Sequence, residues 1–247
     1  MFSFFAPPTS PLPRYALEEF FVKLPGIVTD FNIISDNPIK DEMRKIITKN
    51  PNFMVTGVNA SSDDVTYSNR AGIMLETDGS ESDSVIIEPR TYAVDPYLPL
   101  SSWDKTYWST SSQLVLEFGI VTGPSISSLV FLAGLRLTNY LVPAADADQA
   151  IFYFDGGSPN LRAYYSISGT HTNLDTGVTL AANSVYHLKI SLDSSRIVSF
   201  YVNGQLEKTS SSALTSQINL RPIVGIQSLE AAPKLMHLCY EKLSKVI

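Results

Sequence analysis

Two adjoining stretches decide the fold: Tyr186-His-Leu-Lys-Ile-Ser-Leu-Asp193 and Ile197-Val-Ser-Phe-Tyr-Val-Asn-Gly-Gln-Leu206. In the first stretch apolar residues alternate with polar ones, which places one set on each face of a strand. The second continues this period of two through Val198, Phe200 and Val202. Asn203-Gly204 then predicts a type I′ turn, because both central residues must accept positive φ. Together they predict antiparallel strands joined by tight turns.

The same period recurs through most of the chain. It is visible in residues 71–77, 114–120, 129–137 and 161–167. Strands at short spacing, joined by polar turns, indicate two packed antiparallel sheets. The sequence therefore predicts an all-β, two-sheet jelly-roll sandwich over residues 52–247.

Residues 1–51 differ from the rest and predict an N-terminal arm with one or two short helices. Leu17, Phe20, Phe21 and Leu24 recur at helical spacing before Pro25-Gly26. A second helix is expected over residues 38–50, with an apolar stripe that ends at Asn50-Pro51. The boundary between arm and sandwich is placed near residue 52.

Composition excludes several classes of protein. The formal net charge of -6, without a cluster of Lys and Arg, argues against nucleic-acid binding. The single cysteine, Cys239, allows no intramolecular disulfide. The start of the chain lacks a basic signal-peptide region, and no apolar run is long enough to cross a bilayer, so no membrane partner is expected. We expect a soluble protein made in a cytosol.

The paired stretches at 186–193 and 197–206 resemble the concanavalin A-like, laminin-G-type sandwich. Upstream, residues 71–79, 133–139 and 146–154 look like lectin-like virion proteins of marine phages and related viruses. The resemblance implies a virion location after assembly in a host cytoplasm. It also implies other virion structural proteins as partners, in a homo- or hetero-oligomer. A shared fold does not carry an activity with it.

The apolar arm supports an assembly role. Exposed aromatic residues are unfavourable in water, so the arm is expected to dock on a neighbouring subunit or on its own sandwich. The predicted assembly contacts are Phe2, Phe4, Phe5, Leu17, Phe20 and Phe21. The first hypothesis is therefore a non-enzymatic viral structural protein, associated with a capsid or a tail.

An acidic triplet, Glu76-Thr-Asp78-Gly-Ser-Glu81, offers an alternative, a sandwich-type glycoside hydrolase. Retaining hydrolysis needs two carboxyl groups about 5–5.5 Å apart. Because Gly79-Ser80 indicates a turn, Glu81 is expected to leave the strand. We therefore predict no catalytic residue and no enzymatic activity.

A carbohydrate-binding module is the other alternative. Sugar-binding sandwiches stack sugar rings on exposed aromatic side chains, and the candidates are Trp103, Trp108, Tyr153 and Tyr164. The opposing expectation for the tryptophans is that they plug one end of the sandwich.

No cofactor is expected, and calcium is the weak exception. Its candidate ligands are Asp78, Glu81 and Asp83, or Asp146 with Asp148, but neither group has an EF-hand order. The three histidines, His171, His187 and His237, show no metal-ligand spacing and are expected to be structural.

Overall fold

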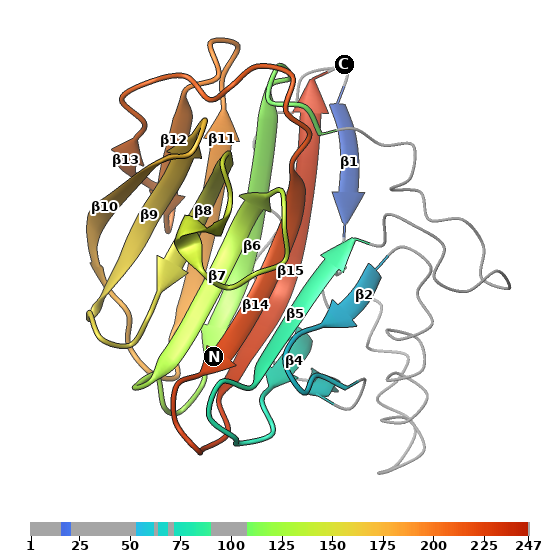
Figure 1. The fold of residues 1–247 in the computed structure, drawn as a ribbon, viewed down its shortest axis with the longest axis vertical. Coiled ribbons are helices and arrows are strands. Elements are labelled where there is room, and N and C mark those ends of the chain that lie inside the picture. The colour runs from blue at the N-terminus through green and yellow to red at the C-terminus, as the bar shows by residue number, and fades with distance from the viewer. Residues whose placement is uncertain (1–15, 21–52, 62–63, 69–71, 90–107, 247) are drawn as a thin grey trace, which may run out of the picture.

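The computed structural model describes residues 16–20, 53–61, 64–68, 72–89 and 108–246. These residues form two β-sheets that pack face to face as a sandwich, as predicted (Figure 1). In the larger sheet the strand order is β13 (Gln205–Thr209), β12 (Val198–Val202), β11 (Val185–Leu192), β6 (Leu114–Thr122), β15 (Leu235–Val246), β4 (Gly72–Glu76) and β3 (Val65–Ser68), with β1 (Ala16–Phe20) also paired to β15. In the smaller sheet the order is β10 (Thr170–Thr179), β9 (Asn160–Ile167), β8 (Gln149–Phe154), β7 (Leu129–Arg136), β14 (Arg221–Ser228), β5 (Ser84–Pro89) and β2 (Phe53–Thr56). All of these strand pairs are antiparallel.

The main hydrophobic core lies between the sheets. Alternate residues of β6 face it, and all four are fully buried: Leu114, Leu116, Phe118 and Ile120. Across the core, Phe152 of β8 meets Phe200 of β12 edge to face, with ring centroids 5.4 Å apart. Such a pair adds roughly 0.5–1.5 kcal/mol beyond its buried area. The period of two in the sequence therefore corresponds to the packing of the two sheets.

The decisive hairpins form as the sequence predicts. The Leu188–Leu192 part of β11 pairs with β12, and β12 turns directly into β13. Val202 pairs with Gln205, so the connection is the two residues between them. Asn203 has φ 50° and Gly204 has φ 84°, as a type I′ turn requires.

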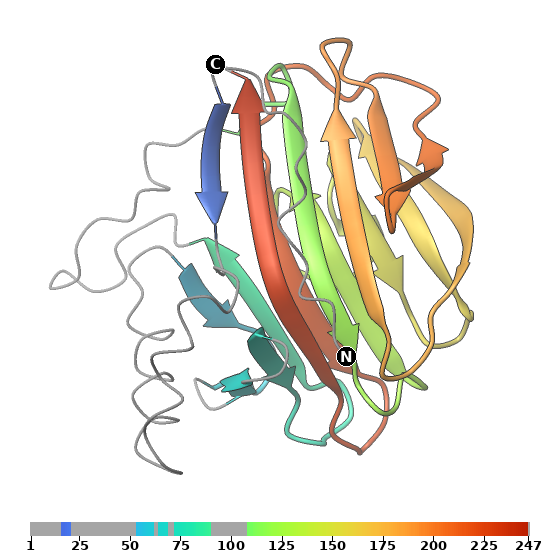
Figure 2. The ribbon, with the colours of Figure 1, turned by 180° about the vertical axis from the view of Figure 1, so that it is seen from behind.

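The helix predicted around residues 17–24 is wrong in its first part, because residues 16–20 form strand β1. Figure 2 shows β1 beside β15. Strand β15 is long, and β4 pairs only with its Leu235–Leu238 part. The edge from Lys242 to Val246 would keep unpaired backbone groups, and β1 pairs with them. Backbone pairing at an open edge has outweighed the helical spacing of the apolar residues.

The short 3-10 turn η4 (Pro143–Ala145) lies between β7 and β8. No helix in the part of the chain that the structure describes has the length and hydropathy to span a membrane. The second predicted helix, at 38–50, lies outside the described residues.

Candidate functional site

The outer face of the smaller sheet carries a second apolar cluster, separate from the main core. Side chains alternate along a strand, so these residues point away from the other sheet. The cluster consists of Ile86, Val130, Leu132, Leu141, Ile151, Tyr164 and Ile223, with Tyr153 packed against it. Burial on an outer face means that another segment covers part of that face.

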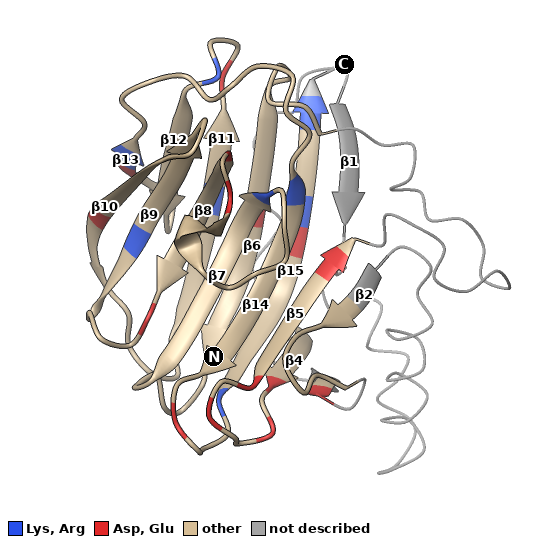
Figure 3. Ribbon diagram, in the orientation of Figure 1, with Lys and Arg blue, Asp and Glu red and all other residues tan. Residues whose placement is uncertain are grey.

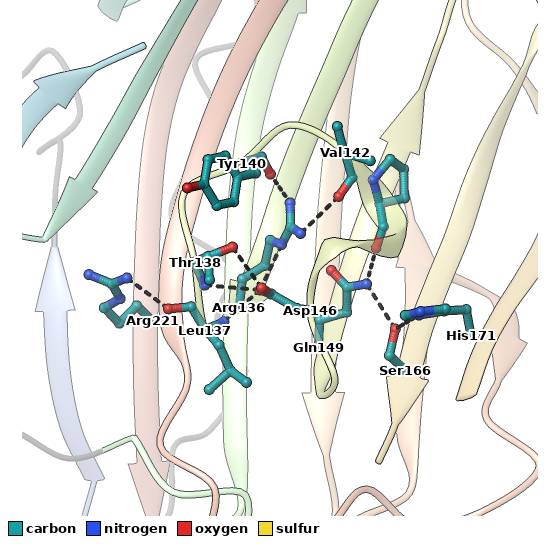
Figure 4. Close-up of polar contacts among 11 residues, drawn as sticks. Arg136, Leu137, Thr138, Tyr140, Val142, Asp146, Gln149, Ser166, His171 and Arg221 are labelled. Carbon is teal, nitrogen blue, oxygen red and sulfur yellow. Dashed lines mark hydrogen bonds and ion pairs between the residues drawn. The ribbon is translucent and has the colours of Figure 1, made fainter. Parts of the chain in front are cut away.

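The covering segment is the connection between β7 and β8, residues 137–148, which we call the strap (Figure 4). Its Leu141 belongs to the outer cluster and lies over Gly225 of β14. A Cβ atom at Gly225 would stand 2.9 Å from Leu141 Cδ2, which is too close for ordinary contact. The missing side chain of Gly225 therefore leaves the room in which the strap packs on the sheet.

A buried ion pair holds the strap to the end of β7. Arg136 Nε donates to Asp146 Oδ2 at 3.1 Å, and both side chains are almost completely inaccessible. The other guanidinium nitrogens donate to the carbonyl oxygens of Tyr140 and Val142. Asp146 also accepts hydrogen bonds from the Thr138 hydroxyl and from two backbone amides of the strap. Each charged group thus has several partners, as a buried ion pair requires.

The hydrogen bonds determine the ionisation of this pair. Burial alone raises the pKa of Asp146, but the bonds from Thr138, the charge of Arg136 and the Leu137 amide outweigh it and lower the pKa. Burial lowers the pKa of Arg136, and Asp146 opposes that effect. Asp146 is therefore a carboxylate at neutral pH, and Arg136 is engaged with the strap.

A second set of contacts holds the opposite flank of the strap. Arg221 donates to the Leu137 carbonyl oxygen at 2.7 Å and lies 3.5 Å from Glu88. Glu88 accepts hydrogen bonds from Asn139 at 2.7 Å and from Thr56 at 2.9 Å. These contacts therefore hold the strap in place over the outer face of β5, β14 and β7.

A polar chain leads from the strap to β10. Gln149 Nε2 donates to the Pro143 carbonyl oxygen and to Ser166 Oγ, the latter at 2.8 Å (Figure 4). Ser166 Oγ lies 2.7 Å from His171 Nδ1. Gln149 and Ser166 are fully buried, whereas His171 is exposed. The chain therefore links an accessible imidazole to the interior of the site.

Beside the strap, the outer face of β8, β9 and β10 is partly accessible, and we call it the open half-face. His171, Asn173 and Asp175 are exposed there, whereas Tyr164 is only 8% exposed. Strand register places the following side chains on it: Tyr153, Arg162, Tyr164, His171, Asn173 and Asp175. The rings of Tyr164 and His171 lie side by side, with centroids 6.1 Å apart. An ion pair of 3.3 Å joins Arg162 to Asp175. The surface therefore combines aromatic rings with hydrogen-bond donors and acceptors.

Both tyrosines of the open half-face keep their hydroxyl protons at neutral pH. Burial raises the pKa of Tyr153 to about 12 and also raises that of Tyr164. Within the described residues the Tyr164 hydroxyl makes no hydrogen bond, and the residue is 8% exposed.

Of the four aromatic residues that were candidates for stacking sugars, three are described, and they lie in different parts of the molecule. Tyr153 and Tyr164 lie on the outer face of the smaller sheet, as the alternation of β8 and β9 predicts. Trp108 is only 1% exposed and packs in the main core, so the prediction of a stacking platform at this residue is wrong. Trp103 lies outside the described residues, as do Phe2, Phe4, Phe5 and Phe21 of the predicted assembly contacts. Leu17 and Phe20 lie in β1.

The acidic triplet does not form a site on one face. Acidic residues occupy the turns at the end of the sandwich near β4 and β5 (Figure 3). Glu76 ends β4, and Glu81 is exposed in the following turn, as Gly79-Ser80 predicted. Asp83 is buried and accepts hydrogen bonds from Asn59 and from the Ser80 amide. This carboxylate stabilises the turn.

In the part of the chain that the structure describes, no three His, Cys, Asp or Glu side chains are grouped so that they could hold a metal ion. The geometry therefore gives no support to calcium ligation by Asp78, Glu81 and Asp83. Asp146, the other calcium candidate, is bound to Arg136, and Asp148 accepts hydrogen bonds from Ser168 and Thr215.

The sequence reasoning missed the strap, its partners and the place of His171. One signal was available in the continuous apolar runs of β5 and β7, because such runs indicate strands buried on both faces. Arg136 ends the run of β7 and Gln149 begins β8, so the two polar residues flank the strap. Polar residues at such positions indicate an internal hydrogen-bond network.

Comparison with known proteins identifies the fold. The sequence matches no known family profile and no curated protein. Among solved structures, alginate lyase AlgAT5 of polysaccharide lyase family 7 superposes with a TM-score of 0.54 at 14% identity, covering 83% of this chain and 99% of the lyase. The Bacillus licheniformis β-glucanase gives 0.52 at 12% identity, covering 80% and 92%. The carbohydrate recognition domain of Emp47p gives 0.54 at 8% identity, covering 79% and 89%.

These structures define the class of fold: a concanavalin A-like jelly-roll sandwich, as the sequence resemblance implied. They also correct the prediction that the chain is not an enzyme. Alginate lyases and a β-glucanase share the architecture, so the fold is one that supports catalysis. The absence of a convincing acidic triplet excluded one mechanism only, and other residues of a sandwich can carry a reaction.

Proposed function

We propose that this protein binds a carbohydrate on the open half-face of its smaller sheet. The observation that carries the proposal is the grouping of the exposed His171 and the half-buried Tyr153 around the ring of Tyr164, beside the strap. Sugar rings stack their C–H faces on aromatic rings, and their hydroxyls need donors and acceptors around the stacking platform. Arg162, Asn173 and the Tyr164 hydroxyl lie where such groups are needed.

The fold is consistent with this proposal. The solved structures that share it include a carbohydrate recognition domain and enzymes named for alginate and glucan. At 8–14% identity they support the fold alone. The assignment of the binding surface therefore depends on the side chains of this chain.

A glycan array followed by titration of the best ligand tests the proposal. We expect Tyr153→Ala and His171→Ala each to weaken binding, by about 2- to 10-fold for the aromatic contact. Tyr201→Ala is the matched control, because Tyr201 lies on the larger sheet, where Lys189 Nζ stands 4.9 Å from its ring centre. Binding that survives both changes on the open half-face, or an array without any ligand, contradicts the proposal.

A specific observation favours a second candidate function, cleavage of a bound polysaccharide by acid–base chemistry. An imidazole hydrogen-bonded to a buried hydroxyl lies beside the ring of Tyr164. Two such groups suit proton donation and abstraction at a glycosidic linkage. Incubation with polysaccharides that bind, with the release of new chain ends as the readout, tests it. Release by wild type that is unchanged in His171→Ala and Tyr164→Phe would exclude these residues as the catalytic pair.

A virion location, with other virion structural proteins as partners, is a further proposal, which rests on the sequence resemblance. The assembly contacts proposed for the arm fall largely outside the described residues. Mass spectrometry of purified particles tests this proposal, and absence of the chain from them overturns it.

A further inference from the structure

The hydrogen bonds of the polar chain that leads to His171 have a defined order of donors and acceptors. The carbonyl oxygen of Pro143 can only accept, so the group of Gln149 that faces it must be the amide nitrogen. The same nitrogen lies 2.8 Å from Ser166 Oγ, and it gives its second hydrogen to that oxygen. The opposite orientation of the amide would place two acceptor oxygens against each other.

Ser166 is in turn the donor to the next residue of the polar chain, His171. Its oxygen accepts from Gln149, so its own hydrogen remains available, and the acceptor in reach is His171 Nδ1 at 2.7 Å. A neutral imidazole that accepts at Nδ1 carries its proton on Nε2. Gln149 Oε1 is left buried without a hydrogen-bond partner. A buried acceptor without a partner is unfavourable, so the amide keeps this orientation because of its two donated bonds.

We propose that Ser166, held by Gln149, is a positioning residue that fixes the neutral His171 imidazole in the tautomer protonated on Nε2. The inference rests on the proposed function and makes it more specific. His171 then presents a hydrogen-bond donor to the ligand, and the carbohydrate contributes an acceptor oxygen at that position. A hydroxyl, a ring oxygen or a carboxylate meets this requirement.

Nitrogen-15 NMR of the imidazole groups tests the tautomer directly and needs no ligand. The chain has three histidines, so His171→Gln assigns the signals, and His187 and His237 serve as internal references. With the imidazole in its neutral form, we expect the Nε2–H tautomer in the wild type and a shift toward a mixture of tautomers in Ser166→Ala. Ser191→Ala is the matched control, a serine on the larger sheet. A wild-type signal of the Nδ1–H form, or a tautomer unchanged in Ser166→Ala, overturns the proposal.

Two further measurements keep the test decisive. Ser166→Cys keeps a side chain of similar shape with a weaker donor, so it replaces Ser166→Ala if that variant does not fold. For an identified ligand, loss of the Ser166 donor should weaken binding by about 2- to 10-fold, the value of one ordinary hydrogen bond. If no carbohydrate binds, the proposed function fails, whereas the tautomer result still decides the role of Ser166.

Discussion

Replacement of Asp146 by Asn tests whether the buried ion pair holds the strap. The change keeps the size of the side chain but removes the charge that lies 3.1 Å from Arg136 Nε. The guanidinium then remains buried with neutral oxygen acceptors alone, among them the carbonyl oxygens of Tyr140 and Val142. Breaking a buried pair in this way costs about 3–5 kcal/mol.

That loss is large against a typical domain stability of about 5–15 kcal/mol. Urea denaturation followed by far-ultraviolet circular dichroism measures it as a lower free energy of unfolding. Asp193→Asn is the matched control, because Asp193 is exposed and accepts bonds from the Ser195 and Ile197 amides of its own turn. We expect this control to change stability by less than about 0.5 kcal/mol.

A double variant separates the pair from the packing around it. Arg136→Met combined with Asp146→Asn removes the uncompensated charge, so its cost should be smaller than the sum of the two single changes. For a buried ion pair, Asp146→Asn should lower the free energy of unfolding by ~3 kcal/mol or more. A loss of less than about 1 kcal/mol would show that the strap does not depend on this ion pair.

Three other outcomes follow from the structure. Folding lowers the pKa of Asp146. The ionised carboxylate therefore contributes its full stability above the unfolded pKa of about 3.9, and this stability is lost as the pH falls through the folded pKa. When the free energy of unfolding is measured against pH, this acid-dependent loss should be absent in Asp146→Asn. Gly225→Ala should cost about 1–3 kcal/mol by overpacking against Leu141, as thermal or urea unfolding would show. Gly157→Ala should not, because its new Cβ would meet no atom closer than 3.6 Å. Burial raises the folded-state pKa of Glu241 to about 8 from an ordinary 4.5, so the free energy of unfolding of the wild type falls as the pH rises between these values. Glu241→Gln should make this decrease smaller. An unchanged slope from pH 5 to 8 in the variant would contradict the raised pKa of Glu241.

Sequence reasoning correctly predicted the strands and turns that depend on local patterns alone. The run from Leu114 to Ile120 shows one apolar face, and Asn203-Gly204 offers a turn that few other residues can form. Both depend on neighbours close in the sequence. The sandwich follows from them, because each strand has one face that must be buried.

The parts that sequence reasoning missed depend on residues far apart in the chain. Strand β1 forms because β15 has an open edge at Lys242–Val246, and no pattern within residues 16–20 shows that edge. The strap depends on Gly225, which lies in a distant strand and leaves room for Leu141.

The candidate site was predicted in part for the same reason. Alternation placed Tyr153 and Tyr164 on the outer face, but it could not show that β10 brings His171 beside them. Trp108 was a candidate for a stacking platform, with a plug at one end of the sandwich as the opposing expectation, and the structure places it in the main core.

The most direct test of the central claim is to map where a bound carbohydrate contacts the protein, by NMR chemical-shift changes or by a crystal structure of the complex. We expect the contacts at Tyr153, Tyr164 and His171, on the outer face of β8, β9 and β10. Contacts confined to the larger sheet or to the turn around Glu81 would show that the open half-face is not the binding surface.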